Sequence, residues 1–190
     1  MKQSLIFLAN GFEETEAIAV IDIMRRAGMD IKSVSITDAH EVTGAHGVTV
    51  NADMLISEVT DSNPEWIILP GGMPGATHLS ECAALNDMLL HQAKHGKIAA
   101  ICASPAVVLA PLGILDGKRA TCYPGFEKKC PKACMADEPV VATDRIITAN
   151  GPAAACLFGL AIVANSMGEN IAYEVGSAML FHPTQEKFYF

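Results

Sequence analysis

The stretch from Lys97 to Pro105 constrains the fold of this chain most, because a strand pattern runs directly into a helix-start pattern. Its first part is a short apolar run that ends at Cys102, which is typical of a strand buried on both faces of a sheet. Ser104 and Pro105 then suit a helix N-cap and a first helical residue. We therefore expect an α/β fold in which Cys102 lies on a sharp turn between a strand and a helix.

Two interpretations of Cys102 follow from this turn. A helix N-terminus lowers a cysteine pKa from ~8.5 towards ~3.5–7.5, and the thiolate is the nucleophilic form. Unpaired backbone N–H groups at the turn can also stabilise an oxyanion. The alternative is a structural cysteine, since cysteine is among the most buried residue types. The turn alone leaves both interpretations open.

The composition is that of a globular chain. Its 190 residues fit a single domain, residues 1–190, that is large enough to bury a substantial core. Hydrophobic residues make up 51% and charged residues 18%, which excludes a disordered chain. The 13 Lys and Arg against 21 Asp and Glu give a net charge of −8, which argues against nucleic-acid and anionic-membrane partners.

Targeting signals and cysteine usage predict a cytoplasmic protein. The first residues lack a signal-peptide pattern, and no apolar run approaches the ~18 residues of a membrane span. The six cysteines are spread over core-like segments, which suits reduced thiols in a cytosol. Cys130 and Cys134 are the one close pair. Without a second pair or nearby histidines we expect no metal there, and a reversible disulfide between them rests on spacing alone.

Alternating strand and helix patterns predict a mostly parallel sheet with helices on both faces. Strands are expected at residues 5–9, 31–36, 66–69, 97–102, 119–123, 140–142 and 146–148, the last two paired with each other. Helices are expected at residues 13–27, 79–95, 105–110 and 153–167, with Gly28 and Gly168 as C-terminal stops. Two short antiparallel strands are expected within residues 39–55 at the sheet edge, and a surface loop with a helical turn at 125–138. Residues 170–190 have too mixed a pattern to assign.

A glycine-rich loop at residues 70–75, Pro-Gly-Gly-Met-Pro-Gly, directly follows one expected strand. Open α/β sheets bind ligands at this place, the carboxyl ends of the strands. The loop lacks the GxGxxG and Walker spacings, so no nucleotide cofactor is expected. With residues 10–16 and 102–104, it makes three junctions that should meet at one edge of the sheet.

The first junction has three carboxylates, Glu13, Glu14 and Glu16, in the opening turn of a helix. The helix dipole favours acidic residues there without any catalytic role. Helical periodicity points Glu13 most directly inward and Glu16 to the flank, so the pattern leaves open which glutamate reaches the sulfur. A carboxyl group beside a thiolate in a dry pocket has a raised pKa, and when protonated it can donate a hydrogen bond or act as a general acid.

The histidines offer no evident partner for the cysteine. All six fall in expected loops or on helix surfaces, where a solvated side chain is the rule: His40, His46, His78, His91, His95 and His182. No Cys–His pair can be assigned from the sequence.

Five motifs occur in order over nearly the whole chain, from about residue 4 to about residue 168. They are Gly11-Phe-Glu-Glu-Thr-Glu16, Asp22-Ile-Met-Arg-Arg-Ala-Gly28, Leu69-Pro-Gly-Gly72, Ala99-Ala-Ile-Cys-Ala103 and Asn150-Gly-Pro152. Each is weak alone, but the ordered set resembles the DJ-one/ThiJ/PfpI superfamily, and its DJ-one branch in particular. The resemblance implies a flavodoxin-like three-layer sandwich with a nucleophile elbow, usually in a homodimer.

The resemblance also implies roles for individual residues. The family's reactive cysteine corresponds to Cys102, and a protonated glutamate corresponding to Glu16 hydrogen-bonds it. The backbone amides of Gly72 and Ala103 would form an oxyanion pocket. The family cysteine oxidises readily to a sulfinate, which fits a low-pKa, exposed thiol. The rest of the pocket would include Glu13, Gly71, Met73, Tyr123, Gly151 and Pro152.

Three positions depart from patterns of the family. Tyr123 stands where the DJ-one branch commonly has a histidine, and a tyrosine with a pKa of ~10 is a poor base at neutral pH. Ala103 replaces the histidine that follows the nucleophile in the protease-like branch, so a peptidase is not expected. Asn51 stands where some relatives have an interface cysteine, which argues against thiol chemistry between subunits.

The resemblance implies a cofactor-independent thiol enzyme of glyoxalase or deglycase type, acting on a small aldehyde or a glycated substrate. In this hypothesis the Cys102 thiolate attacks the aldehyde, and Glu16 moves protons as the hemithioacetal rearranges, so that methylglyoxal yields lactate. The rival hypothesis is a redox sensor or chaperone-like stress protein without a dedicated substrate, in which Cys102 oxidises to sulfinate.

Overall fold

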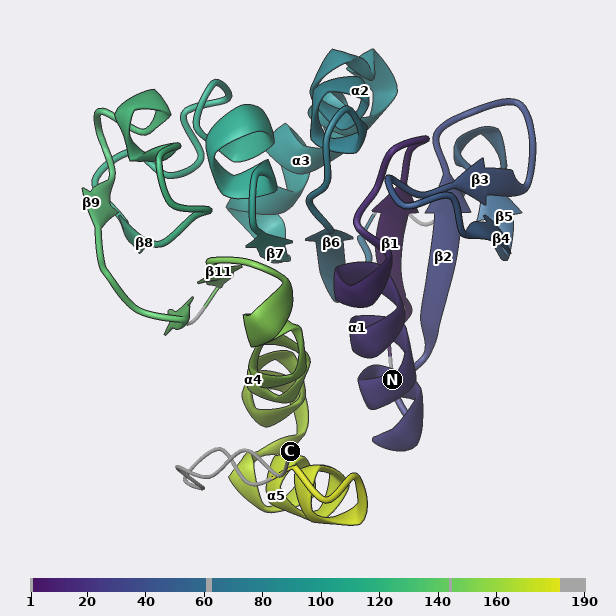
Figure 1. Ribbon diagram of the computed structural model, residues 1–190, viewed down its shortest axis with the longest axis vertical. Helices are drawn as coiled ribbons and strands as arrows, with labels where there is room; N and C mark the ends of the chain where they lie inside the picture. Colours follow the sequence, from purple (N-terminus) through teal and green to yellow (C-terminus); the bar gives the residue numbers. More distant parts are fainter. Residues whose placement is uncertain (1, 61–62, 144, 182–190) are drawn as a thin grey trace.

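The computed structural model describes residues 2–60, 63–143 and 145–181. Its centre is a seven-stranded sheet with helices on both faces (Figure 1). In spatial order the strands are β10 (Val140–Ala142), β11 (Ile146–Ala149), β7 (Lys97–Ile101), β6 (Trp66–Leu69), β1 (Ser4–Leu8), β2 (Ile31–Ser35) and β5 (Met54–Leu55). Every neighbouring pair is parallel except β10 with β11. The order β2-β1-β6-β7-β11 is that of a flavodoxin-like sheet, which confirms the predicted fold class.

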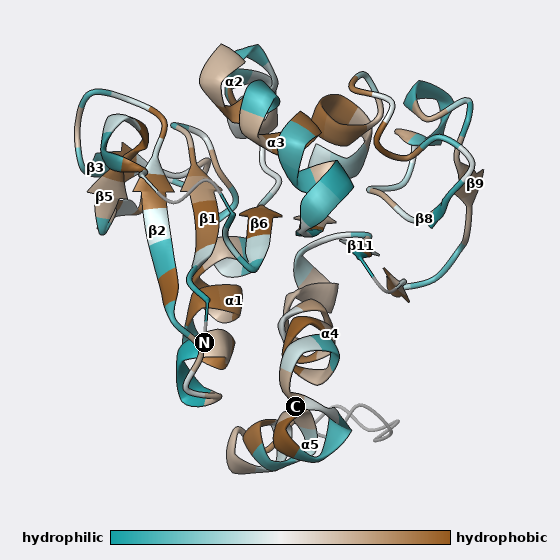
Figure 2. Ribbon diagram, turned by 180° about the vertical axis from the view of Figure 1, so that it is seen from behind, coloured by the Kyte–Doolittle hydropathy of each residue, from teal (hydrophilic) through white to brown (hydrophobic). Residues whose placement is uncertain are grey.

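Two hydrophobic cores, one on each face of the sheet, hold the three layers together. One layer contains α1 (Glu14–Arg26), α4 (Ala155–Met167) and α5 (Glu169–Ala178), and the other contains α2 (Gly75–Glu81) and α3 (Ala83–His95). Alternate residues of β1 enter opposite cores, with Ile6 and Leu8 in the first and Leu5 and Phe7 in the second. Figure 2 shows the hydrophobic character of β1 along much of its length. The apolar runs seen in the sequence reflect this burial on both faces.

Helix boundaries follow local capping signals. Glu13 is the N-cap of α1, and its carboxylate accepts a hydrogen bond from the Glu16 N–H at 2.7 Å. Gly28, with φ of 77°, follows the end of α1, and Gly168, with φ of 94°, ends α4, as predicted. The expected helix at 79–95 is two helices instead, because Cys82 has extended backbone (φ −78°, ψ 101°) between α2 and α3.

The helix expected after Cys102 is different in kind. Pro105–Leu109 (η2) is a five-residue π-helix that begins at Pro105 as predicted. Ser104 does not cap it with its side chain. Its buried hydroxyl instead donates a 2.5 Å hydrogen bond to the carbonyl of Pro70, which ties the turn after β7 to the loop after β6.

Several peripheral elements also differ from expectation. The hairpin β3 (Glu41–Thr43) and β4 (Thr49–Asn51) forms its own two-stranded sheet, and β5 rather than this hairpin extends the main sheet. The expected strand at 119–123 is only β8 (Arg119–Ala120), which pairs with β9 (Cys134–Met135) from the expected loop. The remaining short helices are η1 (Ile56–Glu58), η3 (Glu127–Lys129) and η4 (Pro152–Ala154).

The C-terminal part of the chain adds one helix that the sequence pattern did not show. Within residues 170–190, the structure describes α5 and the residues up to 181, and the remainder lies outside the described residues. The expected pairing of β10 with β11 is confirmed. Among the helices described, none combines the length and apolar character that crossing a bilayer requires.

Candidate active site

The three expected junctions do meet at the carboxyl edge of the sheet. The loop after β1 and the loop after β6 are joined by hydrogen bonds from the Glu13 N–H to the Gly71 carbonyl (2.9 Å) and from the Gly75 N–H to the Gly11 carbonyl (3.1 Å). The turn after β7 is joined to β11 by a 2.8 Å bond from the Cys102 N–H to the Ala149 carbonyl. Parallel neighbours end at the same edge, so this convergence follows from the strand order.

Cys102 has a left-handed backbone conformation, with φ of 64°. Among the described residues other than glycine, only Leu180 shares a positive φ. The conformation costs an L-residue roughly 1–2 kcal/mol. It is held by the bond to Ala149 and by a 2.8 Å hydrogen bond from the Tyr123 N–H to the Cys102 carbonyl. Such a strained turn between strand and helix is the geometry of a nucleophile elbow.

We expect Cys102→Gly to be more stable than Cys102→Ala by about 1 kcal/mol, because only glycine adopts a positive φ without strain. Urea unfolding of both variants measures the difference. Neither variant has the sulfur, so the comparison isolates the backbone. At Ala100, in the buried strand β7, glycine should instead be the less stable residue. If Ala is preferred at both positions, the strain assigned to Cys102 is absent.

Glu16 is the glutamate that reaches the cysteine. Its side chain is fully buried, and Oε2 accepts a 2.6 Å hydrogen bond from the Gly71 N–H. The carboxyl group also interacts with the Cys102 thiol through a hydrogen bond and through charge. The second oxygen, Oε1, is buried and accepts no N–H or O–H hydrogen bond from the described part of the chain. Glu13, which periodicity pointed inward, serves as the N-cap of α1.

Burial dominates the electrostatics of the Glu16–Cys102 pair. It raises the pKa of Glu16 to about 7, despite the opposing hydrogen bonds from Gly71 and Cys102. Burial likewise raises the pKa of Cys102 to about 12, and the charge and hydrogen bond of the neighbouring Glu16 carboxylate add to this rise. The expected low-pKa, exposed thiol is therefore wrong for this structure. Cys102 is only 8% exposed, and burial together with Glu16 outweighs the backbone amides at the turn.

Two backbone amides nevertheless point at the sulfur. The N–H groups of Gly72 and Ala103 donate hydrogen bonds to the Cys102 side chain and act to lower its pKa. These are the two amides expected to form the oxyanion pocket. Gly72 has a φ of 86°, and a methyl group on it would lie 2.4 Å from the Glu13 nitrogen, so this loop requires glycine there.

Of the other expected pocket residues, Gly71 and Tyr123 contact Cys102. Gly71 is in direct contact, since a methyl group on it would lie 3.0 Å from the Cys102 sulfur. Tyr123 bonds the Cys102 carbonyl through its N–H, and its half-exposed ring lies against Gly151, 3.4 Å from the position of a Cβ there. Met73 is 48% exposed in the loop after β6, and Pro152 begins η4.

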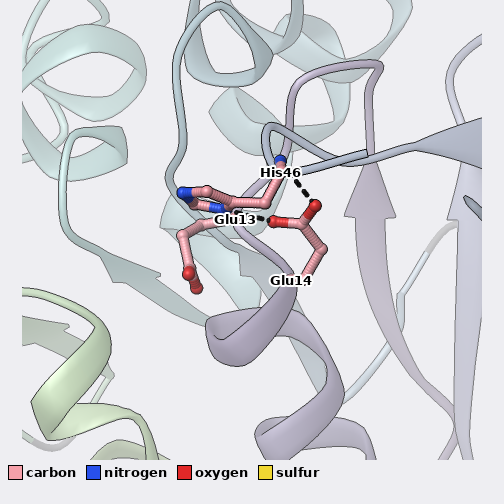
Figure 3. A group of neighbouring side chains, drawn as sticks. All are labelled: Glu13, Glu14 and His46. Carbon is pink, nitrogen blue, oxygen red and sulfur yellow. Dashed lines mark hydrogen bonds and ion pairs between the residues drawn. The ribbon is translucent and has the colours of Figure 1, made fainter. Parts of the chain in front are cut away.

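Glu14 has a separate role beside the hairpin. Its carboxylate accepts hydrogen bonds from the N–H and Nδ1 of His46, at 2.7 and 2.8 Å (Figure 3). Although burial acts against them, these bonds hold the pKa of Glu14 below its usual value. Glu13, Glu14 and His46 form the one group of potential metal ligands found among the described residues. In Figure 3 the Glu13 carboxylate is turned away from the Glu14–His46 pair, and Glu13 and Glu14 are already hydrogen bonded.

The hydrogen bonds and ring contacts of the described histidines involve groups other than Cys102. His40 and His78 bond the carbonyls of Ala52 and Asn10 through Nδ1. His91 and His95 lie against each other on α3. His182 lies outside the described residues.

Sequence reasoning missed two supports of the site. Ser104 was expected to cap a helix but links the loops after β6 and β7. Gly71 was expected only to line the pocket, whereas its N–H bonds Glu16 and its missing side chain makes room for the sulfur. The pair of adjacent glycines in a loop after a buried strand is the signal for a close backbone approach.

Comparison with known proteins gives a family match over most of the chain. Residues 2–165 match the model of the DJ-1/PfpI family. The chain is 38% identical to DJ-1 homolog B of Arabidopsis thaliana over 96% of its own length, but it spans only 42% of that plant protein. It is 36% identical to the glutathione-independent glyoxalase DJR-1.2 of Caenorhabditis elegans, with 85% of this chain and 87% of the relative covered.

Solved structures show the same similarity in three dimensions. The oxidized DJ-1 of Toxoplasma gondii superimposes with a TM-score of 0.91 at 38% identity, covering 95% of this chain and 99% of that one. DJ-1beta of Drosophila melanogaster gives a TM-score of 0.91 at 32% identity, and the match covers 95% of this chain and 98% of that one. With the family model matching most of the chain, this protein belongs to the DJ-1/PfpI family.

Proposed function

We propose that this protein is a cofactor-independent glyoxalase-type enzyme that acts on small reactive carbonyls through Cys102 and Glu16. The observation that carries the proposal is the buried pair itself. A thiol on a strained turn is in contact with a carboxyl group whose pKa is raised to about 7. A general base is most effective when its pKa lies near the operating pH. The relative from Caenorhabditis elegans named as a glutathione-independent glyoxalase supports the same reaction class.

The raised pKa of Cys102 gives Glu16 a defined first task. At neutral pH the thiol is protonated, and the Glu16 carboxylate takes its proton as the sulfur attacks the aldehyde carbon. The developing oxyanion accepts hydrogen bonds from the Gly72 and Ala103 amides that now point at the sulfur. Glu16 then returns the proton to this oxygen, which completes the hemithioacetal and restores the carboxylate.

Rearrangement of the hemithioacetal uses the same carboxylate again. For methylglyoxal, Glu16 removes the proton from the former aldehyde carbon and delivers it to the neighbouring carbonyl carbon, while the hydroxyl proton of the hemithioacetal moves to the neighbouring oxygen, so that the former aldehyde carbon becomes the thioester carbonyl. This leaves a lactate thioester on Cys102, and water releases lactate and the free thiol. Tyr123 is not needed for any proton transfer in this sequence, since its contact with Cys102 is through the backbone N–H.

Lactate formation from methylglyoxal is expected to fall by at least about 10³-fold in Cys102→Ser, because the hydroxyl is a far weaker nucleophile than the thiol in this setting. Enzymatic lactate assay of the wild type and the variant measures it. Cys134→Ser, at an exposed thiol on β9, is the matched control and should retain the wild-type rate. A Cys102→Ser protein with the wild-type rate would show that the reaction does not pass through this sulfur.

A redox role is the second candidate, and it rests on the two amides that point at the sulfur. Such donors also stabilise the oxygens of a sulfinate, and the similar Toxoplasma gondii structure is described as oxidized. This role predicts that graded peroxide adds two oxygens to Cys102 at doses below those that damage Cys134, with negligible lactate formation. Peptide mass spectrometry and the lactate assay on the same samples separate the two functions.

A further inference from the structure

Ser104 has a fully buried hydroxyl group to which the proposed reaction gives no step. The residue lies directly before η2, and its side chain makes no capping hydrogen bond to that helix. Its Oγ–H donates instead to the carbonyl oxygen of Pro70, in the loop after β6, at 2.5 Å. Because a carbonyl oxygen can only accept, the hydroxyl is the donor in this hydrogen bond.

The peptide unit between Pro70 and Gly71 connects this hydroxyl to Glu16. The carbonyl oxygen of the unit accepts from Ser104, and the N–H of the same unit, which belongs to Gly71, donates to Glu16 Oε2 at 2.6 Å. The hydroxyl and the carboxyl group are therefore joined through one peptide unit that is hydrogen bonded at both ends. Ser104 and Glu16 are both fully buried, so bulk water does not compete for either bond.

Two physical effects make the hydroxyl matter for the carboxyl group. A hydrogen bond to the carbonyl oxygen polarises the peptide unit, which makes its N–H a stronger donor. It also fixes the peptide plane, so that the N–H stays directed at the carboxylate. A donor to the ionised form of a carboxyl group stabilises that form and lowers the pKa. The Gly71 amide acts on the pKa of Glu16 in this direction, against the effect of burial.

We propose that Ser104 is a positioning residue of the active site, which acts through the Pro70–Gly71 peptide unit to stabilise the ionised Glu16 carboxylate. Within the described part of the chain, the titratable groups that act on this carboxyl group are Cys102 and Glu13, and a change at Ser104 removes neither. The consequence for catalysis rests on the proposed function, whereas the consequence for the ionisation of Glu16 does not.

Titration of Glu16 in Ser104→Ala tests the proposal without any substrate. Glutamate labelled with ¹³C at the side-chain carboxyl carbon gives an NMR signal for each glutamate, and the Glu16 signal is the one that Glu16→Gln lacks. We expect the pKa of Glu16 to be higher in Ser104→Ala than in the wild type by about 0.5–1 pH unit. Ser35→Ala is the matched control, because it removes an equally buried hydroxyl whose hydrogen bonds go to Thr37. It should leave the pKa of Glu16 unchanged.

The pH profile of lactate formation from methylglyoxal gives a second measurement. In Ser104→Ala the rise of the rate with pH should move upward by the same amount as the pKa of Glu16. The rate should then be about 3–10-fold lower than that of the wild type at pH 6 and close to it at pH 9. A purely structural role would lower the rate by the same factor at every pH. Ser104→Thr, which keeps a hydroxyl group, should restore the wild-type profile.

The possible outcomes separate this role from the proposed reaction. An unchanged pKa of Glu16 in Ser104→Ala, or an equal rise in Ser35→Ala, would overturn the role of Ser104. If Ser104→Ala does not fold, Ser104→Cys decides, because its S–H is a weaker donor and should raise the pKa of Glu16 by a smaller amount. A raised pKa of Glu16 without lactate formation in any protein, wild type included, would reject the glyoxalase function and support the role of Ser104.

Discussion

Replacing Glu16 by glutamine is expected to raise stability relative to the wild type, and this gain should be about 3 kcal/mol larger at pH 8 than at pH 5. The pKa of Glu16 is raised to about 7 from 4.5, so between these two pKa values the folded protein keeps a proton that the unfolded chain releases. Stability of the wild type therefore falls as the pH rises through this window, by about 3 kcal/mol in total. Glutamine has no charge to bury and does not show this loss.

Urea unfolding at pH 5 and pH 8 measures the change in the free energy of unfolding of each protein between the two pH values. The wild type should lose stability between the two pH values, whereas Glu16→Gln should show a smaller change. Glu14→Gln is the matched control in the same helical turn. The pKa of Glu14 is held low by His46 and nearby amides, so its ionised form stabilises the fold and its removal should destabilise the protein at pH 8. An unchanged pH dependence in Glu16→Gln would mean that Glu16 is not buried as a carboxyl group.

The same substitution should remove most of the catalysis. Glutamine cannot take the Cys102 proton or carry a proton between carbon atoms, so we expect lactate formation to fall by roughly 10²–10⁴-fold. In the wild type the rate should rise with pH through about 7, as Glu16 ionises. A gain in stability together with a loss of activity separates this role from simple misfolding. A rate that is independent of pH between 6 and 8 would argue against Glu16 as the base.

Gly71→Ala is expected to lower activity by about 10²-fold through displacement of the reacting groups. A methyl group on Gly71 would lie 2.6 Å from Cys102 Cβ, 2.9 Å from Glu16 Oε2 and 3.0 Å from Cys102 Sγ. Contacts this short force at least one of the two side chains to move. Because Gly71 has no positive φ, the effect is steric and not a matter of backbone strain. We expect a loss of about 1–3 kcal/mol in stability as well.

The lactate assay and urea unfolding measure both effects. Gly151→Ala is the control, because its backbone is extended and a methyl group there would meet only the Tyr123 ring at ordinary contact distances of 3.4 and 3.7 Å. That variant should keep wild-type stability within about 0.5 kcal/mol. If Gly71→Ala were equally harmless, the contact between Glu16 and Cys102 would have to be looser than the structure shows.

Much of the fold could be predicted from local patterns, because each strand buried on both faces is an uninterrupted apolar run. The apolar runs ending at Ala9, Leu69 and Cys102 predicted the central strands β1, β6 and β7, and Gly28 and Gly168 predicted two helix ends. The short elements could not be predicted in the same way. β5, β8 and β9 have two residues each, and such strands depend on a neighbour to pair with and not on a period in the sequence.

For the active site, the sequence by itself determined the position of Cys102 on a turn and the presence of three carboxylates on a neighbouring helix. It could not choose among Glu13, Glu14 and Glu16, since each suits a helix N-terminus equally well. The family resemblance pointed to Glu16, but only the tertiary structure assigned Glu13 to the cap and Glu14 to His46 and placed Glu16 beside the sulfur. It also reversed the expected pKa of Cys102, because the helix-end effect is local, whereas burial and the Glu16 charge arise from segments far apart in the chain.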